Sequence, residues 1–161
     1  MNYEIKSLPA LTLRGWMVKF DGVKLATWET IDEIRRRKSE QLIKLSQTEH
    51  FSQKIAESRD KFGYAIGENR TDGFYYFIGV NSDISAPDHF ELPTQDYIIM
   101  TAKGAASRTL FDQLNAELFA NILPEVSEEY VYEDSYVIEV VTGGTPNDAQ
   151  VELRFPVKKN N

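Results

Sequence analysis

Hydrophobic and polar residues alternate over residues 9–20, which is the pattern of a half-buried β-strand. Leu11, Leu13 and Met17 share one parity along this segment, so we expect that parity to face the core. Asp21-Gly22 follows as a turn signal. The pattern therefore predicts that the first strand ends near residue 20.

A helix and a hairpin follow this strand. Apolar residues recur at roughly helical spacing from Ile31 to Leu45, which predicts an amphipathic helix. Residues 64–66 and 74–80 are rich in aromatic and β-branched side chains, and the turn-rich segment 68–73 joins them. These segments predict two antiparallel strands.

The same order of elements then returns. Residues 97–100 predict a strand, and a helix follows that Ser107 can cap and that we expect Pro124 to end. Residues 136–141 and 151–155 predict a last hairpin. The apolar stripe of the second helix consists of Leu110, Leu114, Leu118 and Ile122.

Both halves of the chain thus have the order strand, helix, strand, strand. The pseudo-repeats span about 3–80 and 91–157, and residues 81–93 resemble a linker with two prolines. Two βαββ units can pair their sheets edge to edge. We therefore expect one α+β domain over residues 1–161, with a single antiparallel sheet, both helices on one face and a ligand pocket on the other.

Length, charge and cysteine content narrow the function classes. A chain of 161 residues suits one domain, and the absence of cysteine removes disulfides, thiol catalysis and thiolate metal sites. The net charge of −7 argues against direct nucleic-acid binding. Residues 1–6 lack the features of a signal peptide, and no segment has the roughly 18 apolar residues of a membrane helix. We therefore expect a cytoplasmic protein that does not contact membranes.

No motif of known chemistry stands out. The chain has neither a glycine-rich phosphate loop nor a dinucleotide fingerprint. Its two histidines, His50 and His89, fall in predicted loop or helix-end segments far apart in the sequence. A metal site or a catalytic relay needs convergent partners, which this pattern does not specify. We expect no cofactor, no metal and no catalytic residue.

One acidic residue interrupts an apolar strand. Glu139 has apolar neighbours on both parities, with Val137 and Val141 on its own face. A carboxylate in apolar surroundings is costly unless it is paired, and such acids are common at functional sites. The strand pattern alone leaves two alternatives open, an exposed acid on a solvated sheet face or a buried ligand anchor.

Aromatic residues are the second candidate feature, because ring faces attract cations. Tyr76 and Tyr97 lie on predicted strands, where most rings simply fill the core. Trp16 lies on the parity opposite to the expected core parity, so we expect it to line a pocket. Trp28 opens the first helix, where it either joins the helix to the sheet or lines the pocket rim.

Several short segments occur in a fixed order along nearly the whole chain. They are Tyr3-Glu4-Ile5, Leu13-Arg14-Gly15, Trp28, residues 75–80, Leu92-Pro93, Tyr97, Lys103-Gly104, residues 137–140 and residues 151–157. In this order and spacing the chain resembles the effector-binding domain of AraC-type and MerR-type multidrug-responsive regulators. The same domain occurs alone as gyrase-inhibitor-like small-molecule-binding proteins. The resemblance implies two βαββ repeats and a central pocket whose acid attracts cationic aromatic compounds.

The resemblance assigns the pocket acid to Glu139 and a second, less regular acidic position to Glu152. The chain departs from the family at Val141 and Arg154, where aromatic residues are frequent. Arg154 shares strand parity with Glu152 and is expected to reach Glu139 across the hairpin. An arginine–carboxylate pair would weaken the attraction for cations, which favours a neutral or zwitterionic ligand. The candidate ligand-binding residues are Glu139, Trp16, Trp28, Tyr76, Tyr97, Glu152 and Arg154.

The resemblance also shapes the expected function. No helix-turn-helix segment fits before residue 3 or after residue 157, so we expect a stand-alone, non-catalytic domain that binds an aromatic small molecule. We expect a link to transcription regulation or ligand sensing. One alternative is a hydrolase of reactive aromatic compounds with Glu139 as general base and Glu152 as its assistant. Another is a protein-interaction module such as a DNA gyrase inhibitor, whose acidic charge mimics DNA. The ligand, the protein partner and the oligomeric state stay open.

Overall fold

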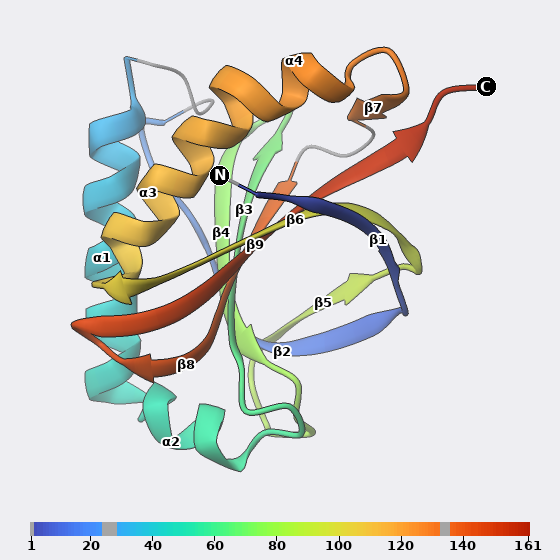
Figure 1. Ribbon diagram of the computed structural model, residues 1–161. Coiled ribbons are helices and arrows are strands. Elements are labelled where there is room, and N and C mark those ends of the chain that lie inside the picture. The colour runs from blue at the N-terminus through green and yellow to red at the C-terminus, as the bar shows by residue number, and fades with distance from the viewer. Residues whose placement is uncertain (1, 24–28, 133–135) are drawn as a thin grey trace. The chain divides into compact units, whose positions relative to one another are not determined.

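The computed structural model describes residues 2–23, 29–132 and 136–161, and the chain divides into two compact units (Figure 1). The N-terminal unit comprises Thr12–Glu91. The C-terminal unit comprises Met1–Leu11 together with Leu92–Asn161. Each unit has its own strands, helices and core, so each can be understood from its own residues.

The N-terminal unit contains an antiparallel hairpin extended by further strands. Its strands stand in the order β3-β4-β2-β5, and β4 pairs antiparallel with both β3 and β2. Residues Thr71 and Asp72 form the turn between β3 and β4, as the sequence predicts. The elements are β2 (Leu11–Lys19), α1 (Ile31–Thr48), α2 (Phe51–Glu57), β3 (Gly63–Arg70), β4 (Gly73–Val80) and β5 (Asp88–Leu92).

The core of the N-terminal unit lies between its helices and one face of its sheet. Ile34 and Leu45 of α1 and Phe51 of α2 are buried against alternate residues of β4. The pairing of Gly15 with Gly79 is very close, because a Cβ on Gly15 would lie 2.0 Å from the carbonyl oxygen of Ile78. The β4 residues in this core are Phe74, Tyr76, Ile78 and Val80.

Strand β2, the first strand that the pattern predicts, packs against apolar side chains on both faces. Leu13 is completely buried, as its parity predicts. Trp16 and Val18 have the opposite parity, yet they pack against the core beneath the helices. The expectation that only the Leu13 parity faces a core is therefore wrong. The physical reason is the neighbouring strand β4, which is apolar on both faces and so requires burial on both sides.

The C-terminal unit repeats the strand arrangement of the N-terminal unit. Its strands stand in the order β1-β6-β9-β8, and β7 pairs with β9. In each unit the last strand of the βαββ motif lies between the other two, which confirms the predicted repeat. The elements are β1 (Glu4–Leu8), β6 (Gln95–Ala105), α3 (Ser107–Glu117), a π-helix η1 (Leu118–Ile122), α4 (Leu123–Val126), β7 (Tyr130–Tyr132), β8 (Tyr136–Thr145) and β9 (Asp148–Lys159).

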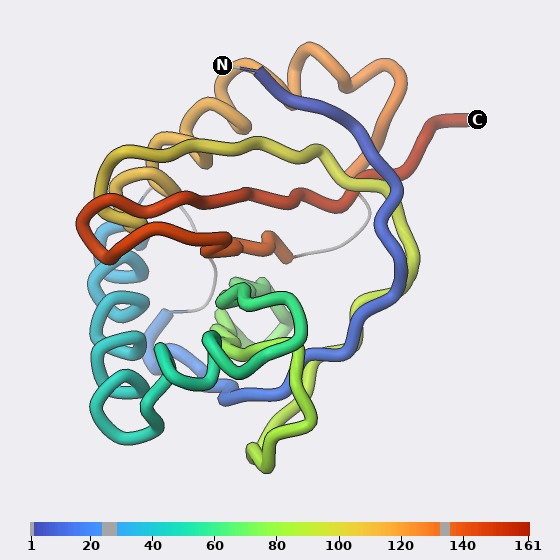
Figure 2. Tube along the Cα trace, turned by 60° about the horizontal axis from the view of Figure 1, so that its bottom comes forward, coloured from blue at the N-terminus to red at the C-terminus, as the bar shows by residue number. Residues whose placement is uncertain are grey.

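Two short strands extend the predicted repeats. Strand β1 precedes the first repeat in sequence but pairs antiparallel with β6 of the C-terminal unit, and Figure 2 shows the blue N-terminal strand beside β6. Strand β5 lies within the predicted linker 81–93 and is the neighbour of β2. The first strand of the N-terminal βαββ unit is β2, which begins at Leu11. Neither strand has enough alternating apolar residues to be recognised from the pattern alone.

The apolar stripe of α3 is buried as predicted. Leu110, Leu114, Leu118 and Ile122 pack in one core with alternate residues of β6 and β9, among them Met100 and Leu153. Pro124, however, does not end the helix as the sequence analysis expects. The chain passes through η1 into α4, and Pro124 lies in the first turn of α4, where a missing backbone N–H costs little.

None of the described helices is both long and apolar enough to cross a membrane.

Candidate functional site

Glu139 lies on the helix-covered face of the C-terminal sheet. Its same-parity neighbours on β8, Val137 and Val141, pack against the core beneath α3. Because adjacent strand residues point to opposite faces, Ile138 and Val140 point away from α3. The sequence analysis expects the ligand site on the face opposite the helices, whereas the structure places the Glu139 carboxylate beneath α3. The side chain is 3% exposed, so Glu139 is a buried acid rather than a solvated one.

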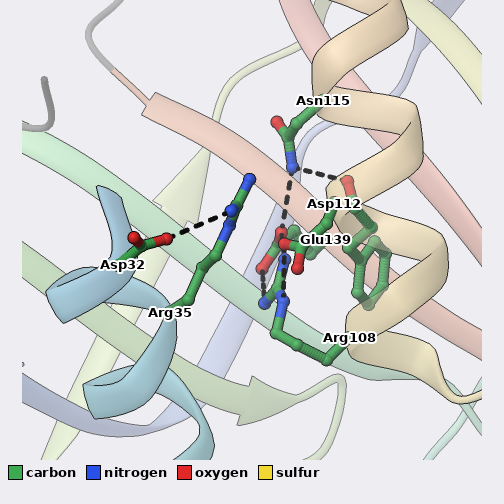
Figure 3. Close-up of polar contacts among 7 residues, drawn as sticks. Asp32, Arg35, Arg108, Asp112, Asn115 and Glu139 are labelled. Atoms are coloured by element: carbon green, nitrogen blue, oxygen red, sulfur yellow. Dashed lines mark hydrogen bonds and ion pairs between the residues drawn. The ribbon is translucent and has the colours of Figure 1, made fainter. Parts of the chain in front are cut away.

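Helix α3 provides the partners of this carboxylate (Figure 3). Arg108 donates from Nη1 to Oε1 at 3.2 Å and from Nη2 to Oε2 at 2.7 Å, a bidentate ion pair. Asn115 donates from Nδ2 to Oε2 at 3.3 Å. The same guanidinium also donates from Nε to Oδ1 of Asp112 at 3.0 Å. Arg108 therefore bridges one carboxylate on the strand and another on its own helix.

Helical periodicity explains why these side chains meet. Arg108, Asp112 and Asn115 are spaced at i, i+4 and i+7, so they project from one side of α3. This polar stripe borders the buried leucine stripe of the same helix. Asn115 also donates to the carbonyl oxygen of Phe111 at 2.9 Å, and the Arg108 guanidinium carbon lies 5.5 Å from the centre of the Phe111 ring. These contacts fix the orientation of the two groups that hold Glu139.

The energetics of the pair depend on its burial. A carboxylate that loses water is costly unless a charged partner and further hydrogen bonds replace that water, and a bidentate arginine meets both needs. The Arg108 side chain is 25% exposed and Asp112 is 30% exposed, whereas Glu139 is 3% exposed. The Arg108 guanidinium and the Asp112 carboxylate are thus partly accessible to water, whereas the Glu139 carboxylate is not.

Arg154 does not pair with Glu139, which corrects the sequence analysis. In the β8–β9 ladder, Glu139 is opposite Leu153, and Arg154 is opposite Ile138. Arg154 and Glu139 therefore point to opposite faces of the sheet. Arg154 donates instead from Nε to Oε2 of Glu152 at 2.5 Å, along its own strand. The arginine partner expected for Glu139 exists, but it comes from α3.

Tyr97 lies on the same face as Glu152 and Arg154. It is buried, and its hydroxyl oxygen accepts a hydrogen bond from Nε2 of Gln95 at 2.8 Å. The same amide donates to the hydroxyl oxygen of Tyr136 at 2.6 Å. Three of the predicted site residues, Tyr97, Glu152 and Arg154, thus lie on the face opposite to Glu139.

The remaining predicted site residues belong to the N-terminal unit. Trp16 meets Phe51 of α2 edge-on, with ring centres 6.4 Å apart, and Lys54 Nζ lies 5.9 Å from the Trp16 ring centre. Tyr76 is buried beneath α1, with Lys38 Nζ 5.4 Å from its ring centre. Both rings therefore lie on the helix-covered face of their sheet. Trp28 lies outside the described residues.

Sequence reasoning missed the three α3 residues that surround Glu139. Arg108, Asp112 and Asn115 carry no motif and look like an ordinary solvated helix face. Their i, i+4, i+7 spacing beside the leucine stripe is the signal that was available. Within the described residues, no group of three or more acidic or histidine side chains could hold a metal ion.

Comparisons with known proteins identify the fold. No family model and no curated protein sequence matches the chain. Among solved structures, SAV2435 bound to tetraphenylphosphonium has a TM-score of 0.77 and 18% identity, covering 98% of this chain and 94% of that one. A Staphylococcus aureus MU50 protein described as a bacterial transcription regulation protein has a TM-score of 0.70 and 20% identity, covering 98% and 99%. The EcmrR C-terminal domain has a TM-score of 0.55 and 13% identity, covering 99% and 98%. The chain therefore has the α+β fold of these proteins, which confirms the fold expected from the resemblance.

Proposed function

We propose that this chain binds a small aromatic molecule and that Glu139 and Arg108 form its polar anchor. The observation that carries the proposal is a 3%-exposed carboxylate held by a bidentate arginine whose own side chain reaches solvent. Buried charged groups of this kind occur preferentially at functional sites. The fold shared with SAV2435, a protein solved with tetraphenylphosphonium, supports a hydrophobic ligand. The fold shared with the Staphylococcus aureus MU50 protein, described as a transcription regulation protein, supports a link to transcription regulation or ligand sensing.

The charge state of the anchor bears on the ligand. A free buried carboxylate would strongly favour a cation, but Arg108 already neutralises Glu139. A cationic ligand must compete with the guanidinium, whereas a neutral or zwitterionic ligand can bind beside the intact pair. The sequence analysis reached the same consequence with Arg154 as the partner, and Arg108 now takes that role.

Exposed aromatic rings on the same face support an aromatic ligand. Phe155 lies two residues beyond Leu153, the partner of Glu139, so it shares the face of Glu139 at a distance of about 7 Å along the strand. Tyr132 stacks on Phe155 with ring centres 4.3 Å apart, and Phe119 meets Phe155 edge-on at 5.8 Å. Tyr132 is 45% exposed and Phe119 is 52% exposed. Rings of this size left partly in water are typical of contact surfaces.

The remaining features of the proposal concern partners and location. The net charge of −7 supports a domain that does not bind nucleic acid directly, and a cytoplasmic location fits a cysteine-free chain. The hydrolase alternative gains no support from the site, because Arg108 engages both oxygens of the acid that would act as general base. No described contact favours the gyrase-inhibitor alternative.

Calorimetric titration with two probes of similar shape tests the proposal. Tetraphenylphosphonium is the cationic probe, and triphenylphosphine oxide is the neutral one. We expect the wild type to bind at least one of them, and Glu139→Gln to change the affinity for the cation about tenfold or more. Glu152→Gln is the matched control, because its acid points to the opposite face, and it should bind as the wild type does. Lack of binding of both probes by the folded wild type would refute the proposal.

A further inference from the structure

Arg108 is held by two carboxylates that belong to different elements. Asp112 lies one turn away on α3 itself, so it stays beside Arg108 whatever happens at the sheet. Glu139 lies on β8 and receives the two terminal nitrogens of the guanidinium. Figure 3 shows Arg108 reaching from the helix to the Glu139 carboxylate, with Asp112 on the same side of the helix. The arginine can therefore give up Glu139 and keep an ion pair.

Glu139, Arg108 and Asp112 differ in their exposure to solvent. Glu139 is 3% exposed, whereas Arg108 and Asp112 are 25% and 30% exposed. The alternative acceptor is thus more accessible to water than the buried acid. A cationic ligand that pairs with Glu139 must compete with the guanidinium that already engages both of its oxygens.

We propose that Arg108 is a built-in competitor for Glu139 and that Asp112 is the residue that retains Arg108 when a cationic ligand displaces it. Asp112 is then a specificity-determining residue, because it sets how readily the acid becomes available to a cation. The inference rests on the proposed function and deepens it. It predicts that the domain discriminates cationic from neutral aromatic molecules, because Arg108 lowers and Asp112 raises the affinity for a cation.

Removal of Arg108 and removal of the Asp112 charge should change the affinity for a cation in opposite directions, for electrostatic reasons. Without Arg108, a cation no longer competes with the bidentate guanidinium for the buried carboxylate of Glu139. Without the Asp112 charge, the displaced guanidinium has lost its second acceptor, so displacement costs more. A neutral ligand displaces nothing and should not respond to Asp112. A purely structural role of the two residues would instead weaken both kinds of ligand together.

The test is calorimetric titration of the full chain with tetraphenylphosphonium and triphenylphosphine oxide. Arg108→Gln should bind the cation about tenfold more tightly than the wild type, and Asp112→Asn about tenfold more weakly. Asp112→Asn should bind the neutral probe within about twofold of wild type, because Asp112 is not part of the polar anchor. In the double variant the effect of Asp112→Asn should vanish, because no guanidinium remains to be retained. Arg36→Gln is the control, since Arg36 is also held by two carboxylates, Glu33 and Glu40, but is 55% exposed.

The outcomes separate this inference from the proposed function. If neither probe binds the wild type, the proposed function and this inference both fail. If the wild type binds the cation and Glu139→Gln alters that binding, but Asp112→Asn does not, only the role of Asp112 and Arg108 is overturned. If Asp112→Asn weakens the binding of both probes equally, the proposed role of Asp112 and Arg108 is overturned as well. Should Arg108→Gln fail to fold, the Asp112→Asn result with the two probes decides alone.

Discussion

The two units share one strand order but differ in the chemistry between helix and sheet. In the C-terminal unit, Leu153 lies five residues after the turn-closing Asp148 of its hairpin and pairs with Glu139. The equivalent residue of β4 is Ile78, which pairs with Ala65. An alanine thus occupies, in the N-terminal unit, the position of the buried acid. The comparison teaches that the hairpin framework is common to both units, whereas the acid on β8 and its partners on α3 distinguish the C-terminal unit.

The N-terminal unit uses its helix cations differently. Lys38 Nζ lies 5.4 Å from the ring centre of Tyr76 and 6.0 Å from that of Phe74. The Arg37 guanidinium lies 6.0 Å from the ring centre of Phe20. These are cation–π contacts, which contribute about 0.5–2 kcal/mol each. Loss of one partner of a buried ion pair costs more stability than loss of a cation–π contact, because it leaves an uncompensated buried charge.

The largest effect is expected from breaking the buried pair. Arg108→Ala should lower the free energy of unfolding by about 3–5 kcal/mol, because the Glu139 carboxylate stays buried without its bidentate partner. Urea denaturation followed by circular dichroism measures the change. Replacing both partners, with Glu139→Leu and Arg108→Met, should recover most of the loss. A loss below about 1 kcal/mol for Arg108→Ala would show that the pair is not energetically buried.

The second-largest effect on stability is expected from placing an acid in the N-terminal unit at the position equivalent to Glu139. Ala65→Glu places an acid at the position equivalent to Glu139, on a sheet face covered by aromatic side chains. We expect a loss of about 1–3 kcal/mol in the free energy of unfolding, since the new carboxylate loses water without the bidentate arginine that holds Glu139. The loss should shrink at low pH, where the new carboxyl group is neutral. A variant as stable as wild type would contradict the claimed difference between the units.

A smaller effect is expected from the cation–π contacts of the N-terminal unit. Lys38→Met keeps the aliphatic stem but removes the ammonium group above Tyr76 and Phe74. The free energy of unfolding should fall by about 0.5–2 kcal/mol. Lys44→Met, on the same helix, is the control for a general effect of removing positive charge. Equal effects of the two substitutions would argue against a specific contact with the rings.

The smallest effect concerns the turn of the N-terminal hairpin. The hydrogen bond from the Tyr75 hydroxyl, together with Lys19, lowers the pKa of Asp72 below its ordinary value of 3.8. A lowered pKa in the folded state stabilises the fold above the unfolded pKa, and this contribution is lost as the pH falls through the folded value. Asp72→Asn should therefore melt slightly below wild type at pH 7. The difference in melting temperature should shrink as the pH falls below 3.8, and a difference that stays constant in increasingly acidic solution would contradict this assignment.

The sequence predicted the framework of the fold well, for identifiable reasons. The leucine stripe of α3 and the aromatic hairpin β3–β4 have strong periodicity, so their elements could be recognised without tertiary information. Strands β1 and β5 are five residues long and partly polar, and they form only because a sheet edge is available. Their pairing partners lie far away in the sequence, which no local pattern can reveal.

The candidate site was predicted only in part. The buried position of Glu139 agrees with one of the two alternatives left open by its apolar strand. The predicted partner of Glu139, Arg154, was wrong. The choice between Arg154 and Arg108 depends on which sheet face α3 covers. Strand parity excludes Arg154 once the register is known. Parity could not have identified Arg108, whose role depends on helix packing.

The most direct test of the central claim follows the Arg108 guanidinium itself. In arginine-labelled protein, titration with tetraphenylphosphonium should shift the Arg108 guanidinium NMR signals as the probe takes the place of the arginine on Glu139. The Arg154 signals should move less, because that guanidinium pairs with Glu152 on the opposite face. Saturation of the protein with the probe while the Arg108 signals stay in place would contradict the account.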